Sequence, residues 1–109
     1  MRKGIVYLYD VKAGIISEDS DGIFRFEYDK AYASRSDALS ISNTMPITDS
    51  IYESDRLFPF FDGLIPEGWL LDIAQESWKL NPRDRMGLLL SCCRKCIGAV
   101  SVEEVKDGE

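Results

Sequence analysis

Residues 23–28, IFRFEY, give the clearest strand signal in the sequence, because three aromatic side chains alternate with one arginine and one glutamate. Successive side chains of a strand point to opposite faces, so the aromatic rings share one face and the charges share the other. Such a strand suits an antiparallel sheet that packs one face on a core and turns the other to solvent.

The sequence before this strand predicts a hairpin or meander. Residues 3–11 are rich in β-branched and aromatic side chains, and Lys-Ala-Gly at 12–14 leads into a second short run at 15–17. The acidic and glycine-containing run 18–22 then predicts a turn into the 23–28 strand.

The sequence after the strand is less regular until the period changes. Residues 39–42 are a candidate short strand, and Met45-Pro46 marks a break. Beyond Asp55 the apolar spacing becomes helical. Pro66 suits the first turn of a helix, where its missing N–H loses no hydrogen bond, and this helix is predicted to run to about Leu80.

A second helix is predicted from Asn81 to about Cys93. Asn81 is the expected N-cap, Pro82 the first helical residue, and Asp84 completes a start resembling a capping box. One face of this helix carries Met86, Leu89, Leu90 and Cys93. Residues 99–103 alternate as a final strand. The predicted fold is therefore α+β: one domain over residues 1–109, with a curved antiparallel sheet and two main helices in the C-terminal half.

Composition excludes several classes of function. The chain has 109 residues, of which 45% are hydrophobic and 29% charged, so it should fold as an ordinary globular domain. A net charge of −6 with scattered basic residues argues against direct binding to nucleic acid. The sequence has no membrane-length apolar run and no signal-peptide core, which predicts a cytoplasmic protein without membrane contact.

Candidate catalytic and metal-binding residues are few. Cys92, Cys93 and Cys96 are an odd number of closely spaced thiols, which disfavours a disulfide framework. The sequence has no histidine and no second cysteine pair to complete a zinc site, so we expect no metal. It also lacks both glycine-rich phosphate-binding motifs and a base beside Ser91. We therefore expect neither a cofactor nor an enzymatic activity.

Trp69 is the residue that the predicted packing leaves unexplained. On a helical wheel, one arc carries Leu70, Leu71, Ala74 and Trp78, which suffices as a core stripe. Trp69 falls almost opposite that stripe, and its neighbours on the wheel are Asp72, Ile73 and Glu76. We interpret it as an anchor that projects toward a partner. The alternative is that a loop covers the ring, or that the helix begins later and Trp69 is packing.

Three stretches of the sequence resemble a known family. FPFFDGLIPEG at 58–68, NPRDRMGLLL at 81–90 and RKCIGAVSV at 94–102 are similar to the N-terminal subdomain of HipA-type serine/threonine kinases. The stretch IFRFEYDKAY at 23–32 also resembles the Phe-x-Phe-x-Tyr strand of that subdomain, so the likeness covers almost the whole chain. These kinases are toxins of bacterial toxin–antitoxin systems, which a helix-turn-helix antitoxin, HipB, holds in check.

The resemblance implies a partner rather than a catalytic activity. The nucleotide loop, catalytic aspartate and metal ligands of a HipA-type kinase are absent from this sequence. That is similar to the three-gene HipBST arrangement, in which a small separate protein, HipS, supplies this subdomain and neutralises the kinase HipT. The expectation is a HipS-like antitoxin that binds a HipT-like kinase, with a HipB-like protein in the same complex.

The expected partner-binding residues surround the helix start: Glu67, Gly68, Trp69, Asp72, Ile73 and Glu76. Two alternative functions stay open. One is a non-inhibitory structural module that bridges kinase and HipB-like protein. The other is an excised part of a longer HipA kinase, against which the initial methionine and the acidic C-terminal tail argue. An independent small-ligand binder is disfavoured, because the sequence shows no cluster of convergent polar groups.

Overall fold

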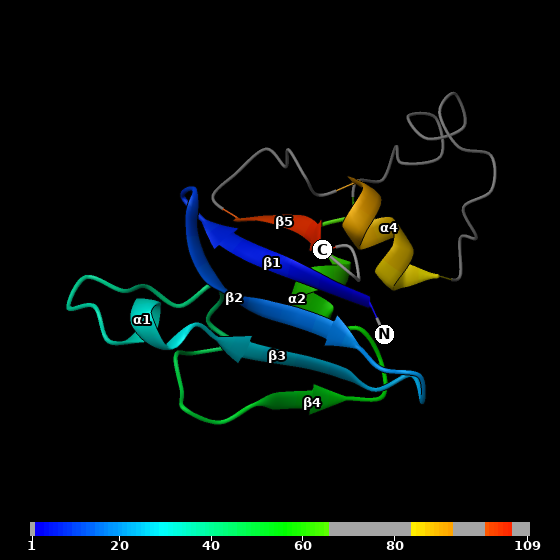
Figure 1. The fold of residues 1–109 in the computed structure, drawn as a ribbon, viewed down its shortest axis with the longest axis horizontal. Helices are drawn as coiled ribbons and strands as arrows, with labels where there is room; N and C mark the ends of the chain where they lie inside the picture. Colours follow the sequence, from blue (N-terminus) through cyan, green and yellow to red (C-terminus); the bar gives the residue numbers. More distant parts are fainter. Residues whose placement is uncertain (1, 66–83, 93–99, 106–109) are drawn as a thin grey trace.

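A computed structural model describes residues 2–65, 84–92 and 100–105. Its main feature is a five-stranded sheet in the order β4-β3-β2-β1-β5, with every neighbouring pair antiparallel (Figure 1). The strands are β1 (Arg2–Leu8), β2 (Val11–Glu18), β3 (Phe24–Tyr28), β4 (Tyr52–Ser54) and β5 (Val100–Val105), and the helices are α1 (Lys30–Ala33), α2 (Pro59–Asp62) and α4 (Arg85–Cys92). The predicted α+β class with an antiparallel sheet is confirmed.

The aromatic face of β3 forms the centre of the core. Phe24, Phe26 and Tyr28 are buried, while Glu27 is exposed, as the alternation predicted. The Phe26 ring is completely buried, and its centroid lies 4.9 Å from that of Tyr28 and 5.5 Å from that of Phe61 in α2. Phe26 therefore joins the sheet to the helical layer.

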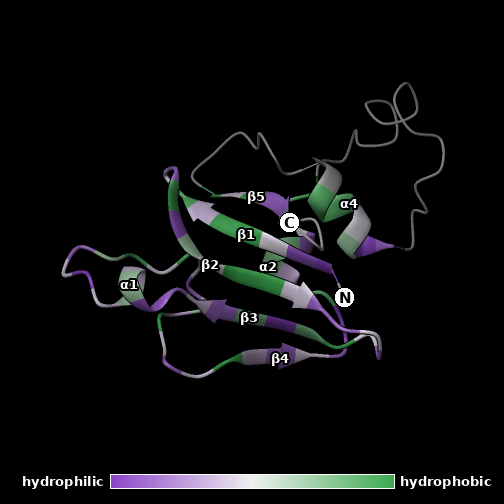
Figure 2. Cartoon of the chain, in the orientation of Figure 1, coloured by the Kyte–Doolittle hydropathy of each residue, from purple (hydrophilic) through white to green (hydrophobic). Residues whose placement is uncertain are grey.

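The helical layer covers the same face of the sheet. In Figure 1, α2 lies behind the strands and α4 lies beside the end of the sheet that carries β5. Met86, Leu88 and Leu89 of α4 are fully buried, and Leu90 is nearly so. Figure 2 shows green apolar segments on α4, β1 and β2. The predicted apolar face of this helix is confirmed for Met86, Leu89 and Leu90, whereas the burial of Leu88 was not predicted.

The first hairpin turns at a different place from the predicted one. Tyr9 and Asp10 connect β1 to β2, with φ values of 51° and 65°, and residues 12–14 lie within β2. Two consecutive positive φ values are typical of the tight hairpin turn whose twist matches that of the strands. Gly14 serves close packing instead, because a Cβ atom there would lie 2.4 Å from the carbonyl oxygen of Glu27.

The short strand predicted at 39–42 is wrong. Only an isolated bridge joins Ser42 to Met45, and the fourth strand of the sheet is Tyr52–Ser54, which pairs with β3. The hydroxyl of buried Tyr28 accepts the amide hydrogen of Ile41 at 3.1 Å and donates to the carbonyl of Met45. Hydrogen bonds of the Tyr28 side chain therefore hold this loop, and not the backbone hydrogen bonds of a strand.

Three further predicted elements can be compared with the structure: a turn, the final strand and the start of α4. The turn predicted at 18–22 is confirmed for residues 19–22, because Asp19 Oδ1 accepts the amide hydrogens of Asp21 and Ile23 at 2.9 and 3.0 Å, whereas Glu18 is the last residue of β2. The final strand is confirmed as β5. The helix that was predicted to start at Pro82 starts at Arg85, since Asp84 Oδ1 caps it by accepting the amide hydrogen of Gly87 at 3.1 Å. The helix predicted at 66–80, together with Asn81, Cys93 and Cys96, lies outside the described residues.

Candidate partner-binding interface

The predicted partner-binding residues all fall between the described ranges. Glu67, Gly68, Trp69, Asp72, Ile73 and Glu76 lie within residues 66–83, which are outside the part of the chain that the structure describes. The structure does describe both ends of this stretch, Ile65 before it and Asp84 after it. We call the parts of α2, α4 and β1 that hold these two ends the base of the candidate interface.

The departing end is built into the core by the sequence PFFDGLI. Pro59 begins α2, Phe61 is completely buried, and Ile65 is 8% exposed. The amides of Leu64 and Ile65 donate to the carbonyls of Phe61 and Asp62 at 3.0 and 3.2 Å, which continues the turn of α2. The aromatic motif that signalled the family therefore anchors the stretch to the sheet.

The returning end is held by Arg2, the first residue of β1. Its guanidinium donates to both carboxylate oxygens of Asp84 at 2.7 Å, and its Nε donates to Glu18 at 2.9 Å. Chiefly because Arg2 donates to it, and also because the Gly87 amide does, the pKa of Asp84 lies below its ordinary value although partial burial opposes the shift. One arginine thus ties the N-terminal strand to the start of α4.

A second ion pair joins the two helices at the same base. Arg85 Nε lies 2.6 Å from Asp62 Oδ1, linking the first residue of α4 to the last residue of α2. Both side chains are about two-fifths exposed, so the pair adds little net stability in water. The pair places the end of α2 beside the start of α4, and these two helices flank the two ends of the 66–83 stretch.

Sequence reasoning missed both ion pairs. Arg2 and Asp84 are 82 residues apart, and Asp62 and Arg85 are 23 apart, so no local spacing connects them. The one available signal was Asp84 itself, which was predicted as part of a capping box and does cap α4.

The base combines apolar side chains with ion-paired charges. A hollow of about 640 Å³ beside it is lined by Phe24, Leu57 and Pro59 together with charged side chains of both signs. Its carboxylates Glu18, Asp62 and Asp84 are all paired with arginines. Across residues 2–65, 84–92 and 100–105, no group of three histidine, cysteine, aspartate or glutamate side chains is placed to hold a metal ion.

The fold and this base define a small α+β domain in which a five-stranded antiparallel sheet carries two helices joined by an ion pair. A family model described as the HipA N-terminal domain matches residues 4–103. A protein of Haemophilus influenzae is 35% identical over 106 residues, which cover 97% of this chain and 95% of that protein. A solved structure described as the N-terminal domain of HipA toxin superposes with a TM-score of 0.75 at 31% identity, covering 98% of this chain and 95% of that one.

The chain therefore belongs to the HipA N-terminal domain family. The resemblance inferred from the motifs at 58–68, 81–90 and 94–102 is confirmed, and the family places the chain in a HipA-type toxin–antitoxin context. Among the described helices, none is long and apolar enough to cross a lipid bilayer.

Proposed function

We propose that this protein is an antitoxin that binds a HipT-like serine/threonine kinase and neutralises it by protein–protein contact. The observation that carries the proposal is the match of residues 4–103 to the HipA N-terminal domain, which relates the chain to a part of a HipA toxin. A domain that belongs beside a kinase and lacks the kinase's catalytic residues is suited to bind it. A HipB-like helix-turn-helix protein is the proposed third member of the complex.

The proposed contact is made by Trp69 with its neighbours Glu67, Gly68, Asp72, Ile73 and Glu76. Ile65 and Asp84 are fixed to the sheet and helical layer, so a segment between them would be presented on a rigid base. Indole rings often dominate interface energetics, and the preceding glycine would let a partner backbone approach closely. The indole could fill an apolar pocket such as one that otherwise takes an adenine ring.

The test is a paired comparison of the two tryptophans. Alanine truncation of an interface anchor costs about 2–4 kcal/mol, so Trp69→Ala should weaken kinase binding and rescue of growth by roughly 30-fold to 1000-fold. Its melting temperature should change little. Trp78→Ala should instead lower the free energy of unfolding by about 3–5 kcal/mol, as a core truncation does.

The measurements are melting temperature, affinity for the co-expressed kinase, and growth rescue. A folded Trp69→Ala protein that still rescues growth would contradict the interface assignment, as would a Trp69→Ala protein that unfolds. Copurification with the kinase and a HipB-like protein without any loss of kinase activity would favour the alternative, a non-inhibitory bridging module.

A further inference from the structure

The face of the sheet opposite the helical layer carries an unusual apolar centre. Alternation along the strands places Lys3, Ile5 and Tyr7 of β1 on this face beside Ile15 and Ser17 of β2. Ile5 and Ile15 are direct cross-strand partners, and Ile15 is 37% exposed. The row that contains this pair ends in Glu103 on one side and Glu27 on the other. An apolar centre with a charged rim is the usual anatomy of a protein interface.

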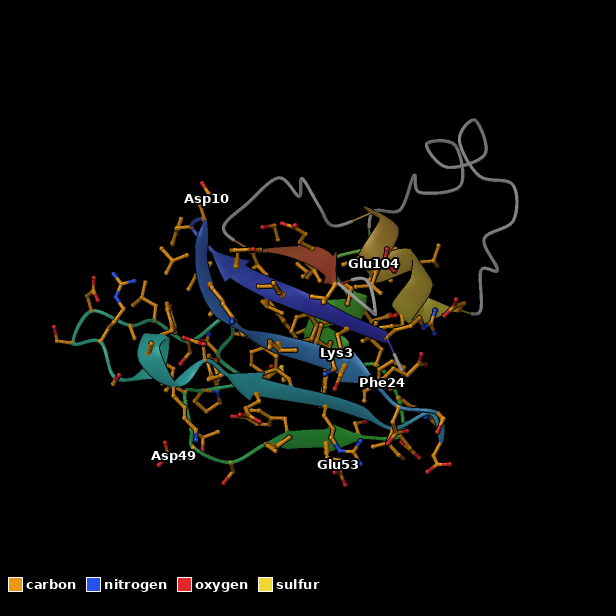
Figure 3. All side chains as sticks on the ribbon, in the orientation of Figure 1. Lys3, Asp10, Phe24, Asp49, Glu53 and Glu104 are labelled. Atoms are coloured by element: carbon orange, nitrogen blue, oxygen red, sulfur yellow. The ribbon has the colours of Figure 1, made fainter. Side chains whose placement is uncertain are left out.

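This face is also hollowed. A cavity of about 460 Å³ extends from the centre of the sheet to α1, and its lining includes Ile15, Ile51, Lys3, Lys30 and Glu27. Ile51 is 52% exposed although it lies beside the edge strand β4. Lys3, labelled in Figure 3, stands in the same cross-strand row as Arg25 and Glu53. We call this cavity the outer hollow.

The charges of the outer hollow favour an acidic occupant. Of the eight arginines and lysines in residues 2–65, 84–92 and 100–105, five pair with carboxylates, and the three without such a partner are Lys3, Lys30 and Arg56. Two of these three line the outer hollow. Its other charges are mostly satisfied: Arg25 binds Asp19 and Glu53, and Asp29 is 3.7 Å from Lys12.

Only Glu27 opposes the two unpaired lysines of the outer hollow, so its unsatisfied charge is positive in a chain whose net charge is −6. Charged groups on facing surfaces arrange so that their potentials are complementary. We propose that the outer hollow is a docking site for a protein segment that presents apolar side chains between carboxylates. The apolar side chains would cover Ile15 and Ile51, and the carboxylates would pair with Lys3 and Lys30. This contact is separate from the one proposed at Trp69 and does not rest on it.

The test uses the isotopically labelled full chain and the acetylated, amidated peptide Ser-Glu-Leu-Glu-Leu-Glu-Ser. Titration should give saturable amide shifts at Ile15, Glu27, Lys30 and Ile51. The matched peptide with lysine in place of each glutamate should bind at least about tenfold more weakly, because it meets the two lysines with like charge.

Two variants localise the site. Lys30→Glu should weaken binding of the acidic peptide to the chain about fivefold. Arg56→Glu makes the same charge change in the hollow of about 640 Å³ beside α2 and should alter the affinity for this peptide by less than about twofold. Ile51→Ser removes exposed apolar surface and should also weaken binding while the domain stays folded. Absent shifts, equal affinity for both peptides, or equal effects of the two charge changes would overturn the proposal. Concentration-dependent shifts of these amides without peptide would also overturn it, by assigning the outer hollow to a second copy of the chain.

Discussion

Asp84 is the residue on which the most separate parts of the fold converge. Its carboxylate accepts two hydrogen bonds from Arg2 of β1 and one from the Gly87 amide of α4. Side-chain exposure of 32% keeps the charge in partial contact with water, so the pair is neither a buried ion pair nor an ordinary surface one.

The lowered pKa of Asp84 makes part of the stability of the fold dependent on pH. The pKa lies below its ordinary value of 3.8, so the stabilisation is complete above that value and is lost as the pH falls through the folded-state pKa. In Asp84→Asn, the free energy of unfolding should therefore fall less than in the parent between about pH 5 and about pH 2. Urea unfolding at each pH measures this difference.

Asp37 provides the control for this pH dependence. Its pKa is also lowered, chiefly because Arg35 donates to it, but its side chain is 69% exposed. Asp37→Asn should therefore reproduce the parent's pH dependence closely. If the two asparagine variants behave alike, the Arg2–Asp84 pair does not contribute to acid sensitivity as we expect.

Tyr28 joins the core to the loop at 39–45 through a buried hydroxyl. Tyr28→Phe would leave the buried amide of Ile41 without this acceptor, so it should lower the free energy of unfolding by about 1–3 kcal/mol. Tyr52→Phe is the matched control, because its hydroxyl donates to the exposed Pro46 carbonyl at 2.7 Å, and it should cost less than about 1 kcal/mol. Equal losses in urea unfolding would show that burial of the Tyr28 hydrogen bonds adds nothing.

At the scale of elements, the first hairpin shows how a turn can escape sequence analysis. Its two turn residues have positive φ, which glycine and asparagine adopt easily and which is uncommon for a bulky tyrosine. Gly14 drew the predicted turn to residues 12–14, although that glycine lies inside β2 to admit the Phe26 ring and the Glu27 carbonyl.

Paired substitutions in the hairpin should have opposite effects. Replacing Tyr9-Asp10 with Asn-Gly should raise the free energy of unfolding by about 0.5–1 kcal/mol, since both residues accept positive φ. Gly14→Ala should lower the free energy of unfolding by at least about 1–3 kcal/mol. The new Cβ atom would clash with the backbone carbonyl of Glu27 as well as with the Phe26 side chain. A Gly14→Ala protein as stable as the parent in thermal unfolding would contradict the packing explanation.

The elements that could be predicted are those whose signal is local. The strand at Phe24–Tyr28 and the buried face of α4 follow from alternation and from helical spacing over a few residues. β4 has three residues and α1 and α2 have four each, which is too short for a period to appear. Likewise, the ion pairs at the base of the candidate interface join residues that only the completed fold brings together.

At the scale of the whole molecule, the domain has two different faces. The inner face of the sheet is covered by α2 and α4, and the ends of the 66–83 stretch are fixed to that helical side. The opposite face carries the outer hollow. The two ends of the 66–83 stretch and the outer hollow therefore lie on different sides of one small sheet.

A domain that acts only by contact should have no nucleotide chemistry of its own. The sequence contains neither glycine-rich phosphate-binding motif, and the carboxylates at the base of the candidate interface are committed to arginines. We therefore expect the purified chain to give no binding heat with magnesium and ATP at micromolar concentrations and to transfer no phosphate to itself or to a general kinase substrate. The kinase partner provides the positive control under the same conditions. Micromolar nucleotide affinity in the isolated chain, retained after Trp69→Ala, would show that the domain has a nucleotide site of its own and is not solely a binding module.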